Sequence, residues 1–565
     1  MQQPEDQTQL AWWARDRSVA TLVFLAALGL RLFHLRELEA HDPFFAQASV
    51  DGALYHAWAQ EILAGAWLGD GVLYLGPLYP GFMAGVYALL GPSLPALKLV
   101  QALLGAASCV LVWGLARELF DRRVAALAGA AAVFYGMLVF YGGTVMIVNL
   151  QVPLVLGLVW ALLRALRQPS FGRWVGCGLL LGLSALARQT TLLLAPVMAL
   201  WLVFGMAGPA SLGRRCALAA SFGGAILALV LPFTIKNYVA GDDLVLLNST
   251  GGGNFYMGNQ PDADGTWRPP PISAGYRLDN PRAMRDAFTG VAERETGRPL
   301  KASEVSSFWL AKGLDEVRAD PMRWLWLELR KFFLFFNAYE VWNNRSIEVS
   351  ERFSWVLRLP LLAFGLVAPL GLLGLVLTLR RWRELVPVYA TLGVYLASAL
   401  IFFVLSRYRM PAALLFVPFA AFAVFELADR LRARDLKTAG ERVAVLVFLA
   451  VLVHLPIPSK QRLHMAYYNL ANKYAALERW DEAFAAYHDS LAERASAIAT
   501  HNNLAVAYEG AGRLDDAIET WQHVYALART RSDRVRIRRA AYHLRELGVD
   551  PDAPPAPGEA RSVDR

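Results

Sequence analysis

The sequence predicts an all-α polytopic membrane protein with about 11 transmembrane helices, followed by a C-terminal α-solenoid. Three observations predict this class. The 565 residues are 56% hydrophobic and only 18% charged, which is too little charge to cover a soluble chain of that size. Long apolar runs recur between residues 19 and 457. A more polar segment with an internal repeat then follows.

A membrane-crossing helix needs about 20 apolar residues. The apolar run 76–91 is broken by glycines and prolines, so it is expected to lie along the membrane surface. The runs that meet or approach the required length are 19–35, 95–119, 124–141, 143–163, 174–187, 189–206, 216–235, 354–379, 385–405, 411–428 and 443–457.

Clusters of Lys and Arg between these runs predict the orientation, because such clusters favour the cytoplasmic side. With residues 1–18 as a cytoplasmic N-terminal arm, every strongly basic short connection falls on the cytoplasmic side. The predicted location is therefore the cytoplasmic (inner) membrane. The opposite, periplasmic side then receives loops 36–94 and 236–353 and the C-terminal segment. The basic connections contain Arg122 and Arg123; Arg164, Arg167 and Arg173; Arg214 and Arg215; Arg380, Arg381 and Arg383; and Arg430, Arg432, Arg434, Lys437 and Arg442.

Composition argues against several other classes of protein. Cys109, Cys177 and Cys216 lie in or beside apolar runs without a CxxC pair, so neither disulfides nor a thiolate metal site is expected. The net charge of +8 comes from arginines between apolar runs, which fits lipid head groups and not nucleic acid. The polar arm before the first run, which lacks a small-residue cleavage site, makes a cleavable signal peptide unexpected.

The segment 464–548 repeats itself every 34 residues. Asn469-Leu470-Ala471 recurs as Asn503-Leu504-Ala505, and Tyr474 recurs as Tyr508. This period resembles the tetratricopeptide repeat, which pairs two antiparallel helices and stacks the pairs into a solenoid with a concave face. The resemblance implies a protein partner, with a solubilising cap as the alternative. Residues 549–565 are rich in Pro, Ala, Gly and charge and are expected to be disordered.

The first outer loop contains the strongest candidate for chemistry. From Asp51, apolar and aromatic residues recur at helical spacing as far as Ile62. A carboxylate at the membrane boundary is suited to general-base catalysis, and Asp51 is the predicted base with Asp42 in reserve. The competing interpretation is that Asp51 caps an interfacial helix. His56 is a further candidate, although a lone His on such a helix usually fills an amphipathic face.

The residues of this loop resemble the GT-C superfamily, notably protein O-mannosyltransferases and aminoarabinose-type lipid A transferases. Those enzymes carry Asp-Glu-x-x-Tyr after the first span, and this chain has Asp51-Gly52-Ala53-Leu54-Tyr55. Gly52 replaces the second acid, so no metal site is predicted and no cofactor is assigned. Further matches are the surface-helix segment Gly76-Pro77-Leu78-Tyr79-Pro80-Gly81-Phe82 and the span end Ala116-Arg117-Glu118-Leu119-Phe120. The chain as a whole resembles bacterial members of the superfamily that end in tetratricopeptide repeats.

Four cations fall on the predicted outer face, against the general bias. Arg188 and Lys236 lie at span ends, and Arg407 and Arg409 lie in Ser406-Arg407-Tyr408-Arg409-Met410-Pro411. They are the candidates for binding a donor phosphate, since Arg suits planar contacts to phosphate. Snorkelling to head groups is the alternative for each one. The last two also resemble the superfamily's arginine before a late span.

The large outer loop contributes helix and contact signals. Its glycine run, 251–253, lacks the strand–loop–helix context of a nucleotide site and favours a structured loop over the site. Asp320-Pro321 predicts a helix start. The residues expected to contact substrate are Tyr55, His56, Tyr79, Glu340 and Asn344, with loop capping as the alternative for the last two.

The resemblance and these residues together imply an inverting membrane glycosyltransferase. It would move a sugar from a polyprenyl-phosphate-linked donor in the membrane lipid to a protein, lipid or glycan acceptor at the outer face. Two other functions stay open at this point. A transporter or flippase of lipid-linked sugars would need ionisable residues inside its spans and internal symmetry. A non-catalytic assembly protein carrying the repeats would need only one span.

Overall fold

The computed structural model describes residues 4–48, 50–66, 71–206, 211–270, 281–457 and 463–552. The chain divides into two compact units, Met1–Ser459 and Lys460–Arg565. Throughout the described residues the regular structure is helical, with two isolated β-bridges, Tyr135–Leu362 and Thr266–Val404. The predicted all-α class is therefore confirmed for this part of the chain.

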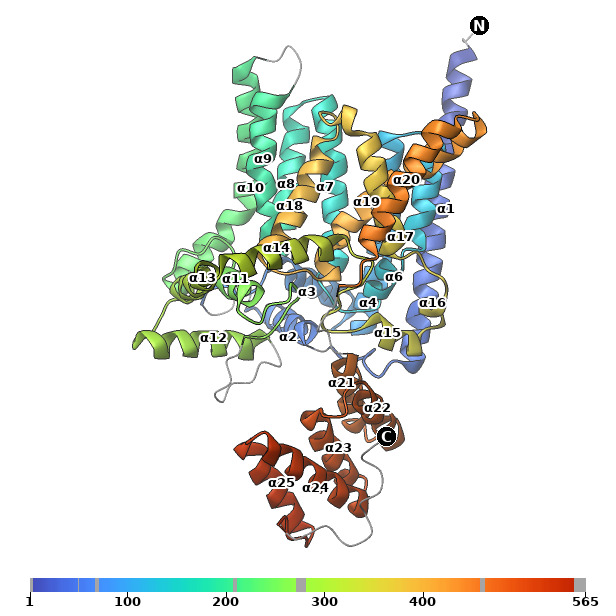
Figure 1. Ribbon diagram of the computed structural model, residues 1–565. Coiled ribbons are helices and arrows are strands. Elements are labelled where there is room, and N and C mark those ends of the chain that lie inside the picture. Colours follow the sequence, from blue (N-terminus) through green and yellow to red (C-terminus); the bar gives the residue numbers. More distant parts are fainter. Residues whose placement is uncertain are drawn as a thin grey trace. The chain divides into compact units, whose positions relative to one another are not determined.

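Within the described residues of unit 1, five helices are long and apolar enough to cross a membrane (Figure 1). This finding supports a membrane protein. The predicted arm 1–18 falls mostly within the first of these helices, whose apolar stretch runs from Asp16. The five are α1 (Pro4–His41), α4 (Leu94–Leu119), α7 (Val148–Arg167), α10 (Leu212–Gly241) and α19 (Ser406–Arg432).

Shorter helices stand beside these five. The predicted run 124–141 is divided, because the backbone leaves the helix at Phe134–Tyr135 to bridge Leu362. The run 354–379 is divided as well. All eleven runs fall on helices, while the number that cross a membrane stays a prediction. The shorter helices are α3 (Leu78–Leu90), α5 (Arg122–Val133), α6 (Gly136–Gly142), α8 (Phe171–Ala187), η1 (Gln189–Leu193), α9 (Leu194–Leu200), η2 (Trp201–Gly205), α16 (Trp355–Arg358), α17 (Phe364–Leu377), η4 (Leu379–Arg381), α18 (Val386–Ile401) and α20 (Leu436–Val453).

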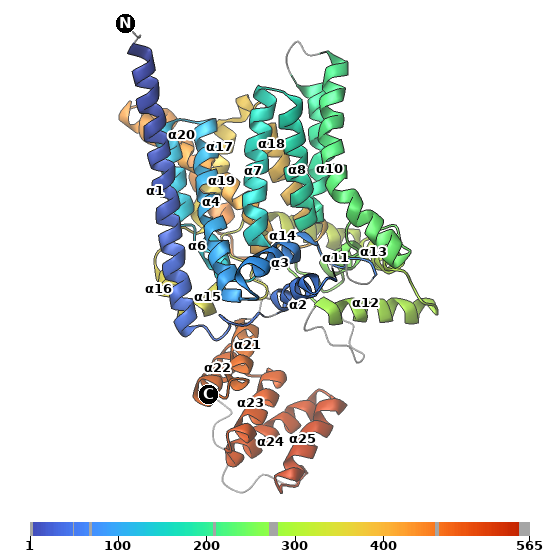
Figure 2. The same cartoon turned by 180° about the vertical axis from the view of Figure 1, so that it is seen from behind.

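Helices from the two predicted outer loops gather at one end of the spanning helices in both ribbon views (Figures 1 and 2). The predicted start of α14 is confirmed, since the Asp320 carboxylate accepts a hydrogen bond from Arg323 N at 2.9 Å. The surface segment 76–91 forms the 13-residue α3, about 20 Å long and too short to span. The outer-loop helices are α2 (Asp51–Leu63), α11 (Gly251–Asn259), α12 (Pro281–Thr296), α13 (Ala302–Ala319), α14 (Pro321–Phe336), α15 (Ile347–Ser350) and η3 (Glu351–Phe353).

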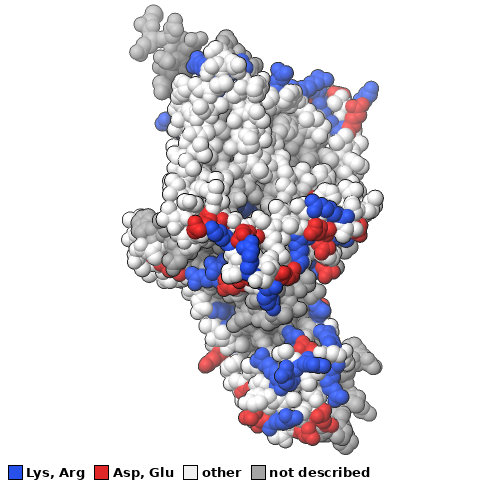
Figure 3. All heavy atoms as spheres, turned by 90° about the vertical axis from the view of Figure 1, so that its left-hand side faces the viewer, with Lys and Arg blue, Asp and Glu red and all other residues white. Residues whose placement is uncertain are grey.

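The arginine-rich connections lie at the opposite end of the same helices. The α4–α5, α7–α8 and α19–α20 connections, like the start of α1, are found there in both views. Figure 3 shows a broad band of uncharged residues on unit 1, with acidic and basic residues gathered at the ends of the band. This separation is the one expected if the band lies in lipid and the outer-loop helices lie at one membrane boundary.

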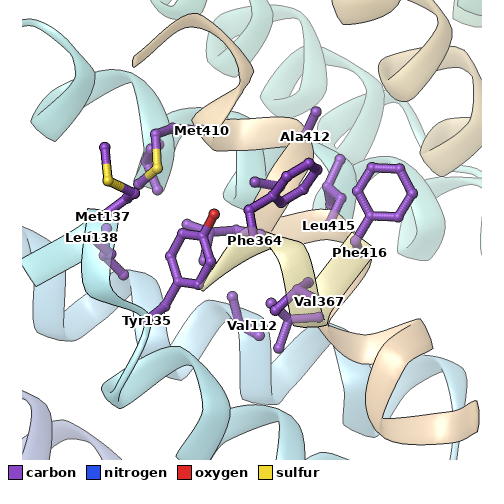
Figure 4. Packing of buried hydrophobic residues seen from close by; sticks show 14 of the residues in the cluster. Val112, Tyr135, Met137, Leu138, Phe364, Val367, Met410, Ala412, Leu415 and Phe416 are labelled. Carbon is purple, nitrogen blue, oxygen red and sulfur yellow. The ribbon is translucent and has the colours of Figure 1, made fainter. Parts of the chain in front are cut away.

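The core of unit 1 is built around α19. Its residues Met410 and Phe416 pack with Phe364 of α17 and Leu138 of α6 (Figure 4). Gly374 of α17 allows this close approach, because a Cβ there would lie 2.1 Å from the Phe419 carbonyl oxygen. Small residues at such crossings let helix backbones meet in membrane proteins.

Replacing Gly374 with alanine is expected to destabilise the protein by about 1–3 kcal/mol, because the helices must separate to admit the methyl group. Gly393→Ala in α18 is the matched control, since a Cβ there meets nothing within 4 Å. Alanine should raise the stability of that helix slightly. Thermal unfolding of the full-length protein in detergent measures both. Equal shifts in the two variants would contradict the close approach.

Unit 2 contains five helices in the described residues, and each packs on the next. Trp521 is fully buried among them. α22 and α24 begin at Trp480 and Leu514, which are 34 residues apart (514 − 480), as the sequence repeat predicts. The assignment to tetratricopeptide repeats stays a prediction, and residues 553–565 of the predicted tail lie outside the described residues. The helices are α21 (Leu463–Ala475), α22 (Trp480–Glu493), α23 (Ile498–Gly510), α24 (Leu514–Thr530) and α25 (Arg534–Glu546).

Candidate functional site

A cavity of about 260 Å³ opens among the outer-loop helices and the ends of the spans that face them. Its wall combines residues far apart in sequence: Asp51 starts α2, Arg188 follows α8, Asn254 lies on α11 and Arg407 starts α19. Three predicted donor-phosphate residues (Arg188, Arg407 and Arg409) and the predicted base therefore line one cavity. A pocket with a few convergent polar groups is the usual form of a ligand site.

Asp51 and Arg407 form an ion pair on this wall. Arg407 Nη1 donates to Asp51 Oδ2 at 2.6 Å, and the two side chains are only 9% and 17% exposed, respectively. The ion pair orients the carboxylate. In the described part of the chain, no donor reaches the second oxygen, Asp51 Oδ1. Arg407 Nε is buried and makes no hydrogen bond to the described residues.

Asp51 lies in the first turn of α2, where the alternative interpretation expects an acid, but it is not the N-cap. The N-cap of α2 is Val50, and no side-chain capping bond is made there. Val50 has φ = 50°, a conformation that a β-branched residue rarely adopts. Strain of this kind is often stored at functional sites. The backbone thus places the Asp51 carboxylate on the cavity wall instead of turning it back onto its own helix.

Arg188 and Tyr408 form a second feature of the wall. The Arg188 Cζ atom lies 3.2 Å from the centre of the Tyr408 ring, so the guanidinium stacks on the ring face. No carboxylate forms an ion pair with Arg188 within the described ranges. Arg407 Nη2 also donates to the Tyr408 hydroxyl at 3.3 Å. Tyr408 thus contacts both arginines, and Arg188 has no carboxylate partner among the described residues.

Arg409 also lines the cavity, but its Nη1 and Nη2 atoms are already hydrogen-bonded to neighbouring residues of the chain. It donates to the carbonyl oxygens of Leu334, Phe335 and Asn337, which end α14. Its Nη2 atom lies 2.9 Å from Glu340 Oε2. The other oxygen, Glu340 Oε1, is buried and makes no hydrogen bond within the described residues. The structure therefore places Arg409 as a clamp on the loop that carries Glu340.

Five predicted site residues lie outside the cavity wall: Lys236, Asp42, His56, Tyr79 and Glu340. Lys236 is buried and donates to the carbonyl oxygen of Gly71. Asp42 is also buried; it accepts from Arg345 Nη1 at 2.7 Å and from Phe44 N at 3.0 Å. Both residues tie together segments of the outer loops, and the roles of Lys236 as a phosphate ligand and of Asp42 as the reserve base stay predictions.

Some of the predicted substrate-contact residues line the cavity, and others lie off its wall. Tyr55 and Asn344 line the cavity. Burial, and then the charge of Asp51, raise the pKa of the Tyr55 hydroxyl well above its usual value, so it stays neutral. Tyr79 is fully buried and donates to Gln101 Oε1 at 2.5 Å. The imidazole of His56 forms a hydrogen bond with the Tyr87 hydroxyl at 2.8 Å. Burial lowers the pKa of His56.

Sequence reasoning missed several residues of the wall, including Tyr408, Tyr74 and Trp267. Tyr408 lies inside the arginine segment that sequence analysis singled out, and its position between two arginines was the available signal. Tyr74 and Trp267 belong to loops without a regular pattern. A second cavity of about 490 Å³ adjoins the first, since Tyr74, Thr250 and Asn254 line both.

The glycine run at the start of α11 serves close packing. A Cβ at Gly252 would lie 1.7 Å from the Ser306 carbonyl oxygen, and one at Gly258 would lie 1.9 Å from that of Phe402. These glycines let α11 sit against α13 and the end of α18 beside the cavity. Across the described residues, no group of three His, Cys, Asp or Glu side chains is arranged to hold a metal ion.

One protein family matches this chain. The model of the dolichyl-phosphate-mannose-protein mannosyltransferases matches residues 75–235. That stretch contains Arg188 and the helices α3 to α10, although it is a minority of the 565 residues. The match supports a GT-C type of membrane glycosyltransferase. No curated protein matches the chain.

Solved structures resemble the chain distantly. The apo oligosaccharyltransferase of Archaeoglobus fulgidus is 13% identical with a TM-score of 0.44, over 83% of this chain and 59% of that one. This chain thus spans 59% of that enzyme's length. ArnT from Cupriavidus metallidurans is 15% identical both in the apo state, with a TM-score of 0.31 over 75% and 79% of the two chains, and bound to undecaprenyl phosphate, with 0.32 over 74% and 79%. These scores are too low to assign a function.

Proposed function

We propose that this chain is an inverting membrane glycosyltransferase that uses a polyprenyl-phosphate-linked sugar donor. The observation that supports this most is the meeting of Asp51, Arg407 and Arg188 on one cavity wall. The cavity is lined by residues of the outer-loop helices α2 and α11, and these helices lie at the end of the bundle opposite the arginine-rich connections (Figures 1 and 2). A lipid-phosphate donor and a polar acceptor meet at a membrane boundary. The family match over residues 75–235 agrees with this class of reaction.

Arg188 binds the donor phosphate in this proposal. It lines the cavity, carries a positive charge and forms no ion pair with a described carboxylate, whereas Arg407 is paired with Asp51 and Arg409 with Glu340. As the bond between the anomeric carbon and the phosphate oxygen breaks, the phosphate leaves with the electron pair. A guanidinium fixed beside the leaving group stabilises that charge.

Asp51 is the general base. The acceptor hydroxyl attacks the anomeric carbon from the face opposite the phosphate, forms the new carbon–oxygen bond and transfers its proton to the carboxylate. Arg407 holds Asp51 Oδ2, and Oδ1 is the oxygen that takes the proton. Asn344, which lines the cavity, contacts the sugar hydroxyls. Glu340 is not on the cavity wall but pairs with Arg409, which is, and its contact with the sugar stays a prediction.

The stacking of Arg188 on Tyr408 gives a test of the phosphate site. Tyr408→Leu removes the ring and should weaken polyprenyl-phosphate binding about 5- to 30-fold, because a desolvated cation–π contact contributes about 1–2 kcal/mol. Tyr408→Phe keeps the ring and should change binding by less than about threefold. Titration of the purified protein with polyprenyl phosphate measures both. Equal losses in the two variants would point to the hydroxyl instead of the ring.

The proposed topology places the cavity and the C-terminal repeats on the same side of the membrane. The N-terminus lies in the cytoplasm, the cavity opens on the periplasmic side of the inner membrane, and the repeats lie on that side too. The repeats recruit a protein partner or present a protein or glycan acceptor. A periplasmic reporter fused to the C-terminus should be active, and activity of a cytoplasmic reporter there would reverse the topology.

Transfer itself is tested with the purified full-length protein. Radiolabelled polyprenyl-phosphate sugars are offered with hydroxyl-bearing acceptors, and label is followed from the lipid to the water-soluble or protein fraction. At least one donor should give enzyme-dependent transfer with inverted anomeric configuration. Donor binding without transfer, accompanied by movement of the intact donor across vesicles, would favour the flippase alternative.

A further inference from the structure

An apolar groove lies between α7 and α8, away from the cavity that Asp51 and Arg188 line. Residues on each helix recur at positions i, i+3, i+4 and i+7, so each helix turns one stripe toward the groove. The groove has a volume of about 530 Å³. It is lined by Gly157, Trp160, Ala161 and Arg164 of α7 and by Arg173, Gly176, Leu179, Leu180 and Leu183 of α8.

The groove is open because glycines line it. A Cβ built at Gly157 or at Gly176 meets no atom within 4 Å. The opposite face of α8 is closed, since Gly178 packs against Phe222 of α10 with a built Cβ only 2.4 Å from that carbonyl oxygen. Leu179 is 40% exposed beside the groove. In a spanning bundle such an exposed apolar face contacts lipid chains.

Arginines gather at one end of the groove. Arg164 stacks on Trp160, with its Cζ atom 4.2 Å from the ring centre. Glu118 is the carboxylate beside them, and it pairs with both Arg164 and Arg167. Arg173 donates to the Gln168 carbonyl oxygen at 2.6 Å, and no carboxylate within the described ranges lies at ion-pair distance from it. Three arginines face one acid, so this end carries net positive charge.

This charged end is remote from the transferase cavity. The cavity wall includes Ile147 and Ala187, at the start of α7 and the end of α8. Arg164 lies 16 residues along α7 from Val148, which is about 24 Å along a helix. Arg173 lies 14 residues from Ala187, or about 21 Å. The arginines therefore sit at the membrane boundary opposite the cavity.

We infer that this groove binds one anionic phospholipid of the leaflet at the arginine-rich end. The stripe on α8 runs from Arg173 to Leu183, about 15 Å, which is half of the roughly 30 Å hydrocarbon core. An acyl chain in the groove thus places its phosphate at Arg173 and Arg164. A polyprenyl phosphate has the same charged end, but its reaction site lies at the other boundary. The dimensions and the charge together favour the phospholipid.

Native mass spectrometry of the full-length protein tests the groove without any transfer assay. The protein in detergent is titrated with phosphatidylglycerol or phosphatidylcholine, and the variants are compared under identical conditions. Arg173→Gln removes the unpaired charge, and Gly176→Leu places a side chain in the groove at a position where a Cβ meets no atom within 4 Å. Arg214→Gln, at an exposed arginine near the start of α10, is the matched control.

The wild-type protein should retain one phosphatidylglycerol in preference to phosphatidylcholine. Arg173→Gln should weaken phosphatidylglycerol binding roughly fivefold, because one arginine near an anionic lipid contributes about 1 kcal/mol. Binding of phosphatidylcholine, which has no net charge, should weaken less. Gly176→Leu should lose the retained lipid while keeping the thermal stability of the lipid-free protein. Arg214→Gln should behave as wild type.

Three results would overturn the inference. The first is equal retention of the two lipids by the wild type. The second is unchanged phosphatidylglycerol binding in Gly176→Leu, since that side chain occupies the groove. The third is displacement of phosphatidylglycerol by an equal concentration of polyprenyl phosphate, which would assign the groove to the carrier lipid. None of these outcomes depends on sugar transfer, so they leave the proposed transferase function untouched.

Discussion

Replacing Asp51 with asparagine is expected to lower the turnover rate by about 10²- to 10⁴-fold, the range for loss of a general base. The amide keeps the size of the carboxylate and still offers Arg407 an oxygen, so the wall should keep its shape. It no longer takes the acceptor proton at neutral pH. Turnover at saturating donor, together with donor affinity in the same preparation, measures the effect. Affinity should change by less than about threefold, since the phosphate contacts Arg188.

Asp42→Asn is the matched control for that experiment. Asp42 is buried in an ion pair with Arg345 and lies off the cavity wall, so its replacement should lower thermal stability. The folded fraction should keep its turnover rate. If the Asp42 variant loses turnover and the Asp51 variant keeps it, the general base is Asp42.

Replacing Arg188 with glutamine is expected to weaken donor binding roughly 10- to 100-fold, because a hydrogen bond to a charged group contributes about 1.5–3 kcal/mol. The Michaelis constant for the donor should rise, and that for the acceptor should stay within about twofold. Lys236→Gln is the control, since Lys236 lies off the cavity wall. Initial rates across donor concentrations measure both variants. Equal effects of the two substitutions would show that general positive charge, not the cavity wall, attracts the donor.

Local pattern predicted much of the fold. The length of the apolar runs predicted the long helices. Asp320-Pro321 predicted the start of α14, and a broken apolar run predicted the short α3. These features depend on neighbouring residues, which a sequence displays directly. The break at Phe134–Tyr135 depends instead on a bridge to Leu362, more than 200 residues away, and no local signal shows it.

The charged residues of the candidate site could be predicted from the sequence, but their partners could not. The sequence predicts Asp51 as a carboxylate in the first outer loop and Arg188 and Arg407 as cations at span ends, and all three share one cavity wall. Arg409 fits the same pattern, but it binds the carbonyl oxygens at the end of α14. Lys236 donates a hydrogen bond to the carbonyl oxygen of Gly71, which lies in a distant loop. A sequence shows that a cation is present, whereas its partner depends on tertiary packing.

The structure of the Asp51→Asn variant with a bound polyprenyl-phosphate sugar would test the central claim most directly, because that variant should hold its donor unreacted. The phosphate should lie in the cavity about 3 Å from the Arg188 guanidinium, with the anomeric carbon facing residue 51. A donor phosphate bound outside this cavity, or a sugar turned away from residue 51, would contradict it.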